Sequence, residues 1–433
     1  MTSALGTPTE VTAVVARRLS LAVRAEQDAT GAAVPPTRRR ELAEELISGE
    51  VYARRSAAAR ADTHSTIDES AALAKAVADS LFAMGGLQPY LDMADVENIN
   101  AFGCDHVSLR FADGRRERGA FPIADSDSDL VELIRTVAAR AGHEERRFDR
   151  GAPILSLQLP DGSRLFAVMS VTKRPSLSVR RHRYPKATLA DLIALGTVDA
   201  SLAAFLSAAV RAKLNILIAG GTGMGKTTML RALAAEMDPS ERLVTIEDAL
   251  ELGLDTDPEA HWDVVPMQAR EANSEGFGAI SQAELVRAGL RMSPDRVIVG
   301  EIRGAEVIPM SNAMSQGNDG SMATLHASTS AGVFSKLAAY AAQSPERLDL
   351  AATNLLVANA LHLIVQLDQA KDGTRVVSSV REITGADGAM ISSNEIYRPG
   401  PDRRAVPATP PSTARMEQLV AAGFTPELFR GRR

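Results

Sequence analysis

The sequence feature that most constrains this chain is a glycine-rich turn between a short aliphatic run and a helical stretch. Leu214 to Ala219 is apolar without alternation, as expected for a strand buried on both faces of a sheet. The residues that follow match G-x-x-x-x-G-K-[ST], and helical periodicity runs from Thr227 to Met237. This strand–loop–helix context predicts a phosphate-binding loop. It consists of Gly220, Gly221, Thr222, Gly223, Met224, Gly225, Lys226, Thr227 and Thr228.

Such a loop binds a nucleoside triphosphate, here predicted to be ATP, mainly through its backbone. Glycines allow the chain to curl so that successive N–H groups point at phosphate oxygens, and the following helix adds its positive end. Lys226 is expected to reach the β- and γ-phosphates, and the Thr227 hydroxyl to bind Mg²⁺. The chain has 41 arginines but only seven lysines, so a lysine at this position is not a product of composition.

Composition places the chain among ordinary globular proteins. Of its 433 residues 45% are hydrophobic and 24% charged, which predicts two or three domains. The net charge of −6 argues against binding nucleic acid by bulk positive charge. Cys104 is the single cysteine, so a disulfide framework is excluded and a reducing compartment is expected. We see neither a membrane-spanning apolar run nor a secretory signal, and expect a cytoplasmic protein without a membrane span.

The pattern divides the chain into four parts. Residues 1–65 are expected to be a weakly structured or helical arm, with a charged helix from Glu41 to Arg60. Residues 66–185 mix helices and strands as a small α+β domain. Residues 186–395 alternate buried strands and helices, which predicts an α/β domain with a mostly parallel sheet. Residues 396–433 are expected to be a linker followed by a short helix.

Within these domains the turn residues predict two hairpins. The strands Ile154 to Leu159 and Arg164 to Val168 flank Pro160-Asp161-Gly162-Ser163. The strands Leu361 to Leu367 and Thr374 to Ile383 flank Asp372-Gly373. A helix is expected over Gln282 to Met292, because Ser281 and Glu284 form a capping box.

Acidic residues follow two of the predicted buried strands. Leu243 to Ile246 is followed by Glu247 and Asp248, and the run that includes Val297 to Val299 is followed by Glu301. A nucleotide site needs acids at strand ends to hold Mg²⁺ and to orient water. We therefore take Glu247, Glu301 and Thr227 as candidate metal ligands, the alternative being strands that simply meet solvent.

A further candidate is His326, at the end of the segment that begins at Gly317. A single histidine after an apolar strand can be structural. Because this one lies downstream of the acidic strand in the same domain, it could instead sense the γ-phosphate.

Together these segments resemble, in the same order, the motifs of the type II/type IV secretion ATPases, most closely the CpaF/TadA-type motors. The loop at 220–228 is similar to the family's Walker A motif, and residues 245–248 to its Asp box. Residues 293–304 resemble its Walker B motif with glutamate, and residues 317–326 its His box. The resemblance covers about residues 70 to 395.

The N-terminal domain adds arginines to this resemblance. Residues 86–91 resemble the family's G-P-L-x-P-L-L segment. Residues 160–164 and 178–181 resemble family segments that bring arginines toward the nucleotide. Arg164 and Arg180 are therefore candidates for neutralising charge on the γ-phosphoryl group. The alternative is that both are ordinary surface arginines. Arg270 lies in a stretch that the family also marks with arginine.

The resemblance implies a RecA-like ATPase with Lys226, Glu301, Glu247, His326, Arg164 and Arg180 as catalytic residues. Glu301 is expected to polarise the attacking water with support from Glu247, although the two could exchange roles. The implied assembly is a homo-oligomeric ring, a hexamer, that acts on an inner-membrane platform protein from the cytoplasmic face. The implied work is Tad pilus assembly or protein secretion. A DNA translocase and a non-hydrolysing ATP-binding scaffold remain the alternatives.

Two positions depart from the family pattern. Asn318 stands where the family usually has histidine, so a titratable ring is replaced by an amide. Pro309 falls within an expected helix after Gly304. Because proline is tolerated only near a helix start, that helix should begin late or be kinked.

Overall fold

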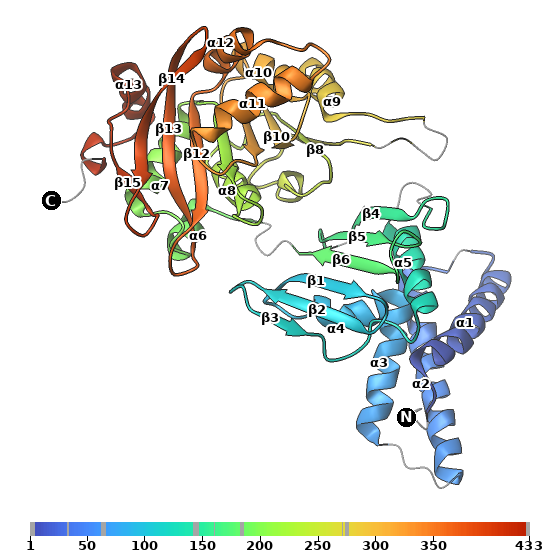
Figure 1. Cartoon of the computed structure of the whole chain (residues 1–433). Coiled ribbons are helices and arrows are strands. Elements are labelled where there is room, and N and C mark those ends of the chain that lie inside the picture. The colour runs from blue at the N-terminus through green and yellow to red at the C-terminus, as the bar shows by residue number, and fades with distance from the viewer. Residues whose placement is uncertain are drawn as a thin grey trace. The chain divides into compact units, whose positions relative to one another are not determined.

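The computed structural model describes residues 5–32, 34–61, 66–141, 147–159, 161–181, 186–270, 272 and 277–429 (Figure 1). The chain forms two compact units, Met1–Arg181 and His182–Arg433. The domain boundary expected at residue 185 lies outside the described residues, as does Pro160 of the predicted hairpin turn.

Three helices begin the first unit, and they bury one apolar face together. They are α1 (Pro8–Thr30), α2 (Pro36–Arg60) and α3 (Ile67–Phe82). Thr7 and Glu10 form a capping box at the start of α1, which ends at Gly31 in the left-handed region with φ 68°. The shared core contains Leu5, Val11, Val15, Ile47, Val51, Leu73 and Val77. Much of the segment that we expected to be weakly structured is therefore helical, and the helix over 41–60 is confirmed.

The rest of the first unit is a six-stranded antiparallel sheet with helix α5 (Asp127–Ala141) packed on it. The strand order is β3-β2-β1-β6-β5-β4. The bounds are β1 (Val96–Phe102), β2 (His106–Phe111), β3 (Arg116–Arg118), β4 (Ile154–Gln158), β5 (Arg164–Val168) and β6 (Ser176–Arg180), with η1 (Gly85–Leu87) and α4 (Gln88–Leu91) before them. Gln158 pairs with Arg164, so the predicted β4–β5 hairpin is confirmed.

The second unit is built on a nine-stranded sheet in the order β15-β14-β13-β12-β7-β11-β10-β8-β9. The six strands from β12 to β9 are parallel, and β13, β14 and β15 add antiparallel. The bounds are β7 (Ile216–Gly220), β8 (Leu243–Glu247), β9 (Val264–Gln268), β10 (Arg296–Ile302), β11 (Met322–Leu325), β12 (Leu363–Gln369), β13 (Arg375–Asp387), β14 (Met390–Pro399) and β15 (Ala405–Pro407). The predicted α/β class and the second hairpin, β12–β13, are confirmed.

Helices cover both faces of this sheet. One face carries α6 (Leu189–Ala194), α7 (Ala200–Arg211), α8 (Lys226–Ala234) and α13 (Thr413–Ala421). The other carries α9 (Gln282–Gly289), α10 (Val307–Ser315), α11 (Gly332–Gln343) and α12 (Leu350–Ala360). Short turns η2 (Leu254–Thr256), η3 (Leu290–Met292) and η4 (Pro426–Leu428) complete the unit.

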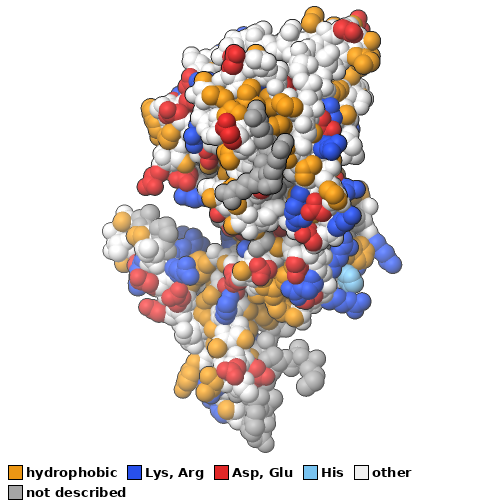
Figure 2. Space-filling view, turned by 90° about the vertical axis from the view of Figure 1, so that its left-hand side faces the viewer, with side chains coloured by type: hydrophobic (Ala, Val, Ile, Leu, Met, Phe, Trp, Pro, Cys, Tyr) orange, Lys and Arg blue, Asp and Glu red, His pale blue; other side chains and the backbone are white. Residues whose placement is uncertain are grey.

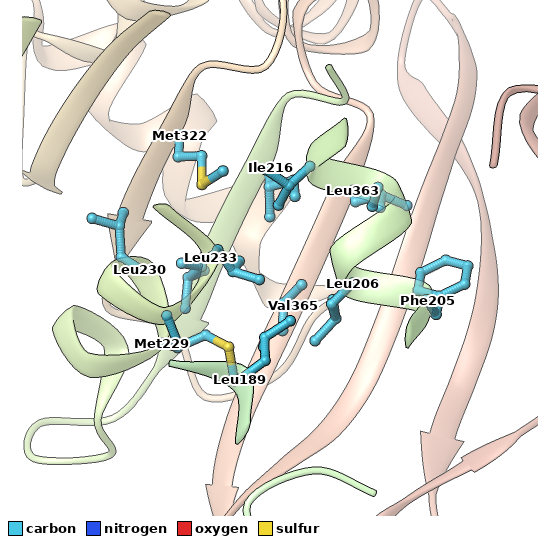
Figure 3. Packing of buried hydrophobic residues seen from close by; sticks show 14 of the residues in the cluster. Leu189, Phe205, Leu206, Ile216, Met229, Leu230, Leu233, Met322, Leu363 and Val365 are labelled. Carbon is cyan, nitrogen blue, oxygen red and sulfur yellow. The ribbon is translucent and has the colours of Figure 1, made fainter. Parts of the chain in front are cut away.

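Alternate residues of the central strand β7 point into two different cores. Ile216 and Ile218 belong to the core under α7 and α8, whereas Leu217 and Ala219 belong to the core on the opposite face. Figure 3 shows Ile216 in one cluster with Leu233 of α8. This burial on both faces explains the aliphatic run before the glycine-rich loop, and it fixes both ends of that loop.

Two helix starts follow the predicted capping rules. Ser281 and Glu284 form the capping box of α9. Helix α10 begins at Val307, so Pro309 lies in its first turn, where the missing N–H removes no intrahelical hydrogen bond. The expectation of a late start is confirmed.

The prediction of a linker after residue 396 is wrong. Residues 396–399 are the end of β14, and β15 follows. Tyr397 is 2% exposed and packs edge-on against Phe205 of α7 and Phe429. Buried Glu382 accepts hydrogen bonds from the backbone and hydroxyl of Ser412. Apolar burial and these bonds make the C-terminal segment part of the second unit. Basic and acidic side chains are intermixed on the visible surface (Figure 2).

Candidate functional site

The glycine-rich loop joins β7 to α8 at the carboxyl edge of the parallel strands. Gly220 ends β7, α8 begins at Lys226, and residues 220–228 form the continuous strand–loop–helix connection that the motif predicts. Gly223 and Gly225 have φ of 77° and 88°, a region that side chains with a Cβ rarely adopt. These two glycines therefore allow the tight curl needed for backbone N–H groups to surround a phosphate.

Lys226 is the buried cation of this loop, with 8% of its surface exposed. Its Nζ donates to the carbonyl oxygens of Gly220 at 3.2 Å and Gly221 at 3.1 Å. The same Nζ lies 3.1 Å from Nδ1 of His326. The amino group is thus held over the loop, where incoming phosphate oxygens would compete with these carbonyls.

His326 follows β11, which lies between β7 and β10 in the sheet. Its Nε2 lies 2.6 Å from Oε1 of Glu301, and that oxygen has no aligned hydrogen-bond donor among the described residues. Burial, and then the charge of Lys226, lower the pKa of His326 below its usual 6.5. The structure therefore brings together Lys226, His326 and Glu301, which come from three adjacent strand ends.

Glu247 has a different environment, although it too ends a strand. It is 4% exposed, and its Oε2 accepts hydrogen bonds from the backbone N–H groups of Glu251 at 2.9 Å and Leu252 at 3.0 Å. Burial raises its pKa to about 7. A Cβ at Gly300 would come within 2.9 Å of the Glu247 Cγ, so glycine on β10 makes room for this side chain. The carboxylate closes the loop after β8.

Arg303 is a site residue that sequence reasoning missed. Its Nε and one terminal nitrogen lie 2.9 and 2.7 Å from Oε2 of Glu301. Its other terminal nitrogen donates to Asp248 at 2.8 Å. The available signal was spacing: Arg303 is two residues beyond Glu301, and residues i and i+2 of an extended chain share a face.

Arg164 and Arg180 lie directly opposite each other on β5 and β6 of the first unit. The pairing continues through Asn98 of β1 to Arg110 of β2 and Arg116 of β3, so four arginines share one row across the sheet. Directly opposed like charges are unfavourable in a sheet unless other groups compensate them. Because the row and the loop belong to different units, the nucleotide contact of Arg164 and Arg180 stays a prediction.

Two other predicted positions have local structural partners. Arg270 donates through Nε to the Gly278 carbonyl at 2.7 Å. Asn318, the departure in the His box, donates its amide to the Pro294 carbonyl at 2.6 Å. The amide therefore ties together two turns of the second unit.

The residues at the loop are chemically suited to Mg²⁺. This ion usually keeps several waters and takes one or two carboxylates plus substrate phosphates. Thr227, in the first turn of α8, and Glu301 or Glu247 would supply such ligands. Across the part of the chain that the structure describes, there is no cluster of three or more His, Cys, Asp and Glu side chains suited to hold a metal by itself.

The nine-stranded sheet, its two helical layers and the loop at the β7–α8 junction define a RecA-like P-loop fold. The chain belongs to the type II/IV secretion system protein family, whose model matches residues 96–419. The resemblance drawn from the motifs is confirmed at this level. Among the described residues, no helix is both long and apolar enough to cross a membrane.

Relatives above 30% identity include two that cover more than two thirds of the chain. A protein of Mycobacterium tuberculosis, provisionally named a conjugal transfer protein, is 34% identical over 318 residues, covering 72% of this chain and 87% of its own. The type IV secretion system protein PtlH of Bordetella pertussis is 32% identical over 325 residues, covering 68% and 92%. The crystal structure of the pilus retraction motor PilT with bound ADP shares the fold at 15% identity. Its TM-score is 0.51, with 78% of this chain and 86% of that one covered.

Proposed function

We propose that this protein is an ATP-hydrolysing motor of the CpaF/TadA type. The observation that carries the proposal is the contact series from Lys226 through His326 to Glu301 at the carboxyl edge of three adjacent strands. This is where a nucleotide on the loop would present its γ-phosphate. When bound, Mg²⁺ would neutralise phosphate charge, held by Thr227 and a strand-end carboxylate.

Within this proposal Glu301 orients the attacking water. Its Oε1 has no aligned hydrogen-bond donor in the described structure and lies beside His326 and the loop, so it can accept a hydrogen bond from a water molecule. Glu247 is less suited to this step because its Oε2 already binds two backbone N–H groups. Its role is to fix the segment after β8. Lys226 attracts the phosphates. When its amino group moves from His326 to the phosphate oxygens, His326 loses its contact with Lys226.

The proposed assembly is a homohexameric ring that acts on an inner-membrane platform protein from the cytoplasmic side. Arg164 and Arg180 would bring positive charge to the γ-phosphoryl group, and hydrolysis would move one unit against the other. The CpaF/TadA-type motifs support Tad pilus assembly or protein secretion as the work of the motor. The membership of the type II/IV secretion family supports coupling to a membrane apparatus.

A DNA translocase is the alternative with a specific observation in its favour, since the M. tuberculosis relative carries a conjugal-transfer name. Single-stranded DNA should then raise the ATPase rate severalfold in a salt-dependent way. The net charge of −6 instead favours protein transport over DNA translocation.

The experiment that tests the proposed function is ATP hydrolysis per protomer at rising protein concentration, together with particle mass. A steep rise that coincides with ring formation supports a motor whose sites are completed between subunits. A constant, appreciable rate on a monomer contradicts the ring. If ATP binds to the assembled ring without turnover, the chain is an ATP-binding scaffold instead.

A further inference from the structure

Oε2 of Glu301 is held by the fork of Arg303. Two nitrogens of one guanidinium approach the same oxygen, at 2.9 and 2.7 Å. Oε1, the other oxygen of this carboxylate, is the one beside His326. The two oxygens therefore have separate environments, one fixed by Arg303 and one open to the loop.

Arg303 is itself fixed from a second strand. Its third nitrogen donates to Oδ2 of Asp248, just after β8, at 2.8 Å. Oδ1 of Asp248 accepts from Nε2 of Gln282 at 2.7 Å. Gln282 is 6% exposed and is the first residue of α9, whose start is held by the capping box. A rigid element thus supports the series from Gln282 through Asp248 to Arg303.

The geometry points to Arg303 as the positioning residue of Glu301, with Asp248 and Gln282 holding Arg303 in turn. This inference rests on the proposed ATP hydrolysis. A carboxylate that orients water must keep one rotamer, and a planar guanidinium bound through two nitrogens enforces that geometry better than a single ammonium can. The hydrogen bonds of the Arg303 guanidinium go to Glu301 and Asp248, so it acts on the water-orienting carboxylate by holding Glu301.

The test compares Arg303→Gln, Arg303→Lys and Asp248→Asn in the full chain, with Arg398→Gln on the exposed part of β14 as the matched control. Loss of a supporting contact of this kind typically costs 10- to 100-fold in activity. We expect Arg303→Gln to lower kcat by about that factor, with KM for ATP within about twofold. Arg303→Lys should recover only part of kcat, because lysine keeps the charge without the fork. Arg398→Gln should leave both constants unchanged.

A double-mutant comparison separates positioning from a merely structural role. If Asp248 acts only by holding Arg303, the single variant Asp248→Asn should lower kcat. Adding Asp248→Asn to Arg303→Gln should then lower kcat no further. Additive losses, or a KM that rises as much as kcat falls, would overturn the inference. The thermal unfolding midpoint of each variant shows whether the protein remains folded. If Arg303→Gln unfolds the chain, Arg303→Lys and Asp248→Asn carry the same test.

Failure of this inference can be told apart from failure of the proposed function. If Glu301→Gln lowers kcat but Arg303→Gln and Arg303→Lys do not, Glu301 keeps its role and Arg303 has none in catalysis. If Glu301→Gln leaves kcat unchanged, the inference about Arg303 falls, whereas ATP hydrolysis stands with Glu247 in the role of Glu301. If the wild-type ring does not hydrolyse ATP, both proposals fall together.

Discussion

The amino group of Lys226 lies 3.1 Å from Nδ1 of His326, although the two residues are 100 positions apart in the chain. A lysine ammonium can donate to a neutral imidazole nitrogen but is repelled by an imidazolium. The contact therefore requires a neutral ring, which agrees with the lowered pKa of His326. A phosphate that draws Lys226 away would release this restraint, so the pair can report on the occupancy of the loop.

Lys226→Ala should reduce ATP turnover to background, because the loop loses the side chain that reaches the β- and γ-phosphates. It should also raise the pKa of His326, since the charge of Lys226, one of the causes that lower this pKa, is removed. Steady-state hydrolysis and an NMR titration of His326 measure the two effects. Wild-type turnover in the variant would exclude residues 220–228 as the hydrolytic site.

Glu301→Gln should keep ATP binding and lower kcat at least ~100-fold, the scale of a lost general base. Glutamine is isosteric and retains an acceptor for Arg303, so the fold should be preserved. Binding of a fluorescent ATP analogue and single-turnover hydrolysis distinguish the two steps. An unchanged kcat would transfer the role to Glu247.

Glu247→Gln tests the buried carboxyl through stability. Its pKa is about 7 when folded, against about 4.3 in an unfolded chain, so the folded state binds more protons between these values. The stability of the wild type should therefore fall as pH rises from about 4.5 to 7, by roughly 3 kcal/mol from this group. The variant lacks this loss and should have the higher urea midpoint at pH 8.5 but not at pH 4.5. If the variant and the wild type have equal urea midpoints at both pH values, burial does not shift the pKa of Glu247.

The strand–loop–helix unit could be predicted because its information is local. Burial of β7 on both faces appears as an aliphatic run, and the conformation of the loop appears as glycines at fixed spacing. The capping box of α9 and the first-turn Pro309 are equally local. For the same reason Lys226 could be found from the loop motif, and Glu301 and His326 from the apolar runs that precede them.

What could not be predicted depends on contacts between distant segments. The fork from Arg303 to Asp248 joins two strands 55 residues apart. Strand β14 was obscured because its burial is supplied by α7, through Phe205 and Tyr397, rather than by alternation in its own sequence. Helix α1 is stabilised by an apolar face that it shares with α2 and α3.

His362 should make the second unit less stable to unfolding at acidic pH. Its Nδ1 accepts a hydrogen bond from the Asn215 N–H at 2.9 Å, which protonation would abolish. Burial, and then the charge of Arg415, lower its pKa to about 4, with Asp319 acting in the opposite direction. The unfolded chain takes up this proton near pH 6.5 and the folded chain only near 4, so stability is present above 6.5 and is lost as pH falls through this window.

The loss from His362 should be roughly 3 kcal/mol between pH 6.5 and 4, and it runs opposite to the trend from Glu247. His362→Asn keeps an acceptor at the δ position without a titratable ring. The urea midpoint of the variant relative to wild type should therefore be higher at pH 4.5 than at pH 7, because only the wild type loses the contribution of His362 in acid. The same acid sensitivity in both proteins would assign the effect to other groups.

Arg164→Ala and Arg180→Ala should each lower kcat at least ~100-fold with little change in ATP affinity, because cations near a γ-phosphoryl group act mainly on the transition state. Arg116→Ala is the matched control, since Arg116 lies in the same row on strand β3 at the edge of the sheet. Removing either member of the directly opposed Arg164–Arg180 pair also relieves like-charge repulsion, so the thermal midpoint should not fall by more than a few degrees. A loss of kcat in the Arg116 variant as large as in the other two would mean that the row acts through its overall charge. Unchanged kcat in Arg164→Ala and Arg180→Ala would leave them as surface arginines of the sheet.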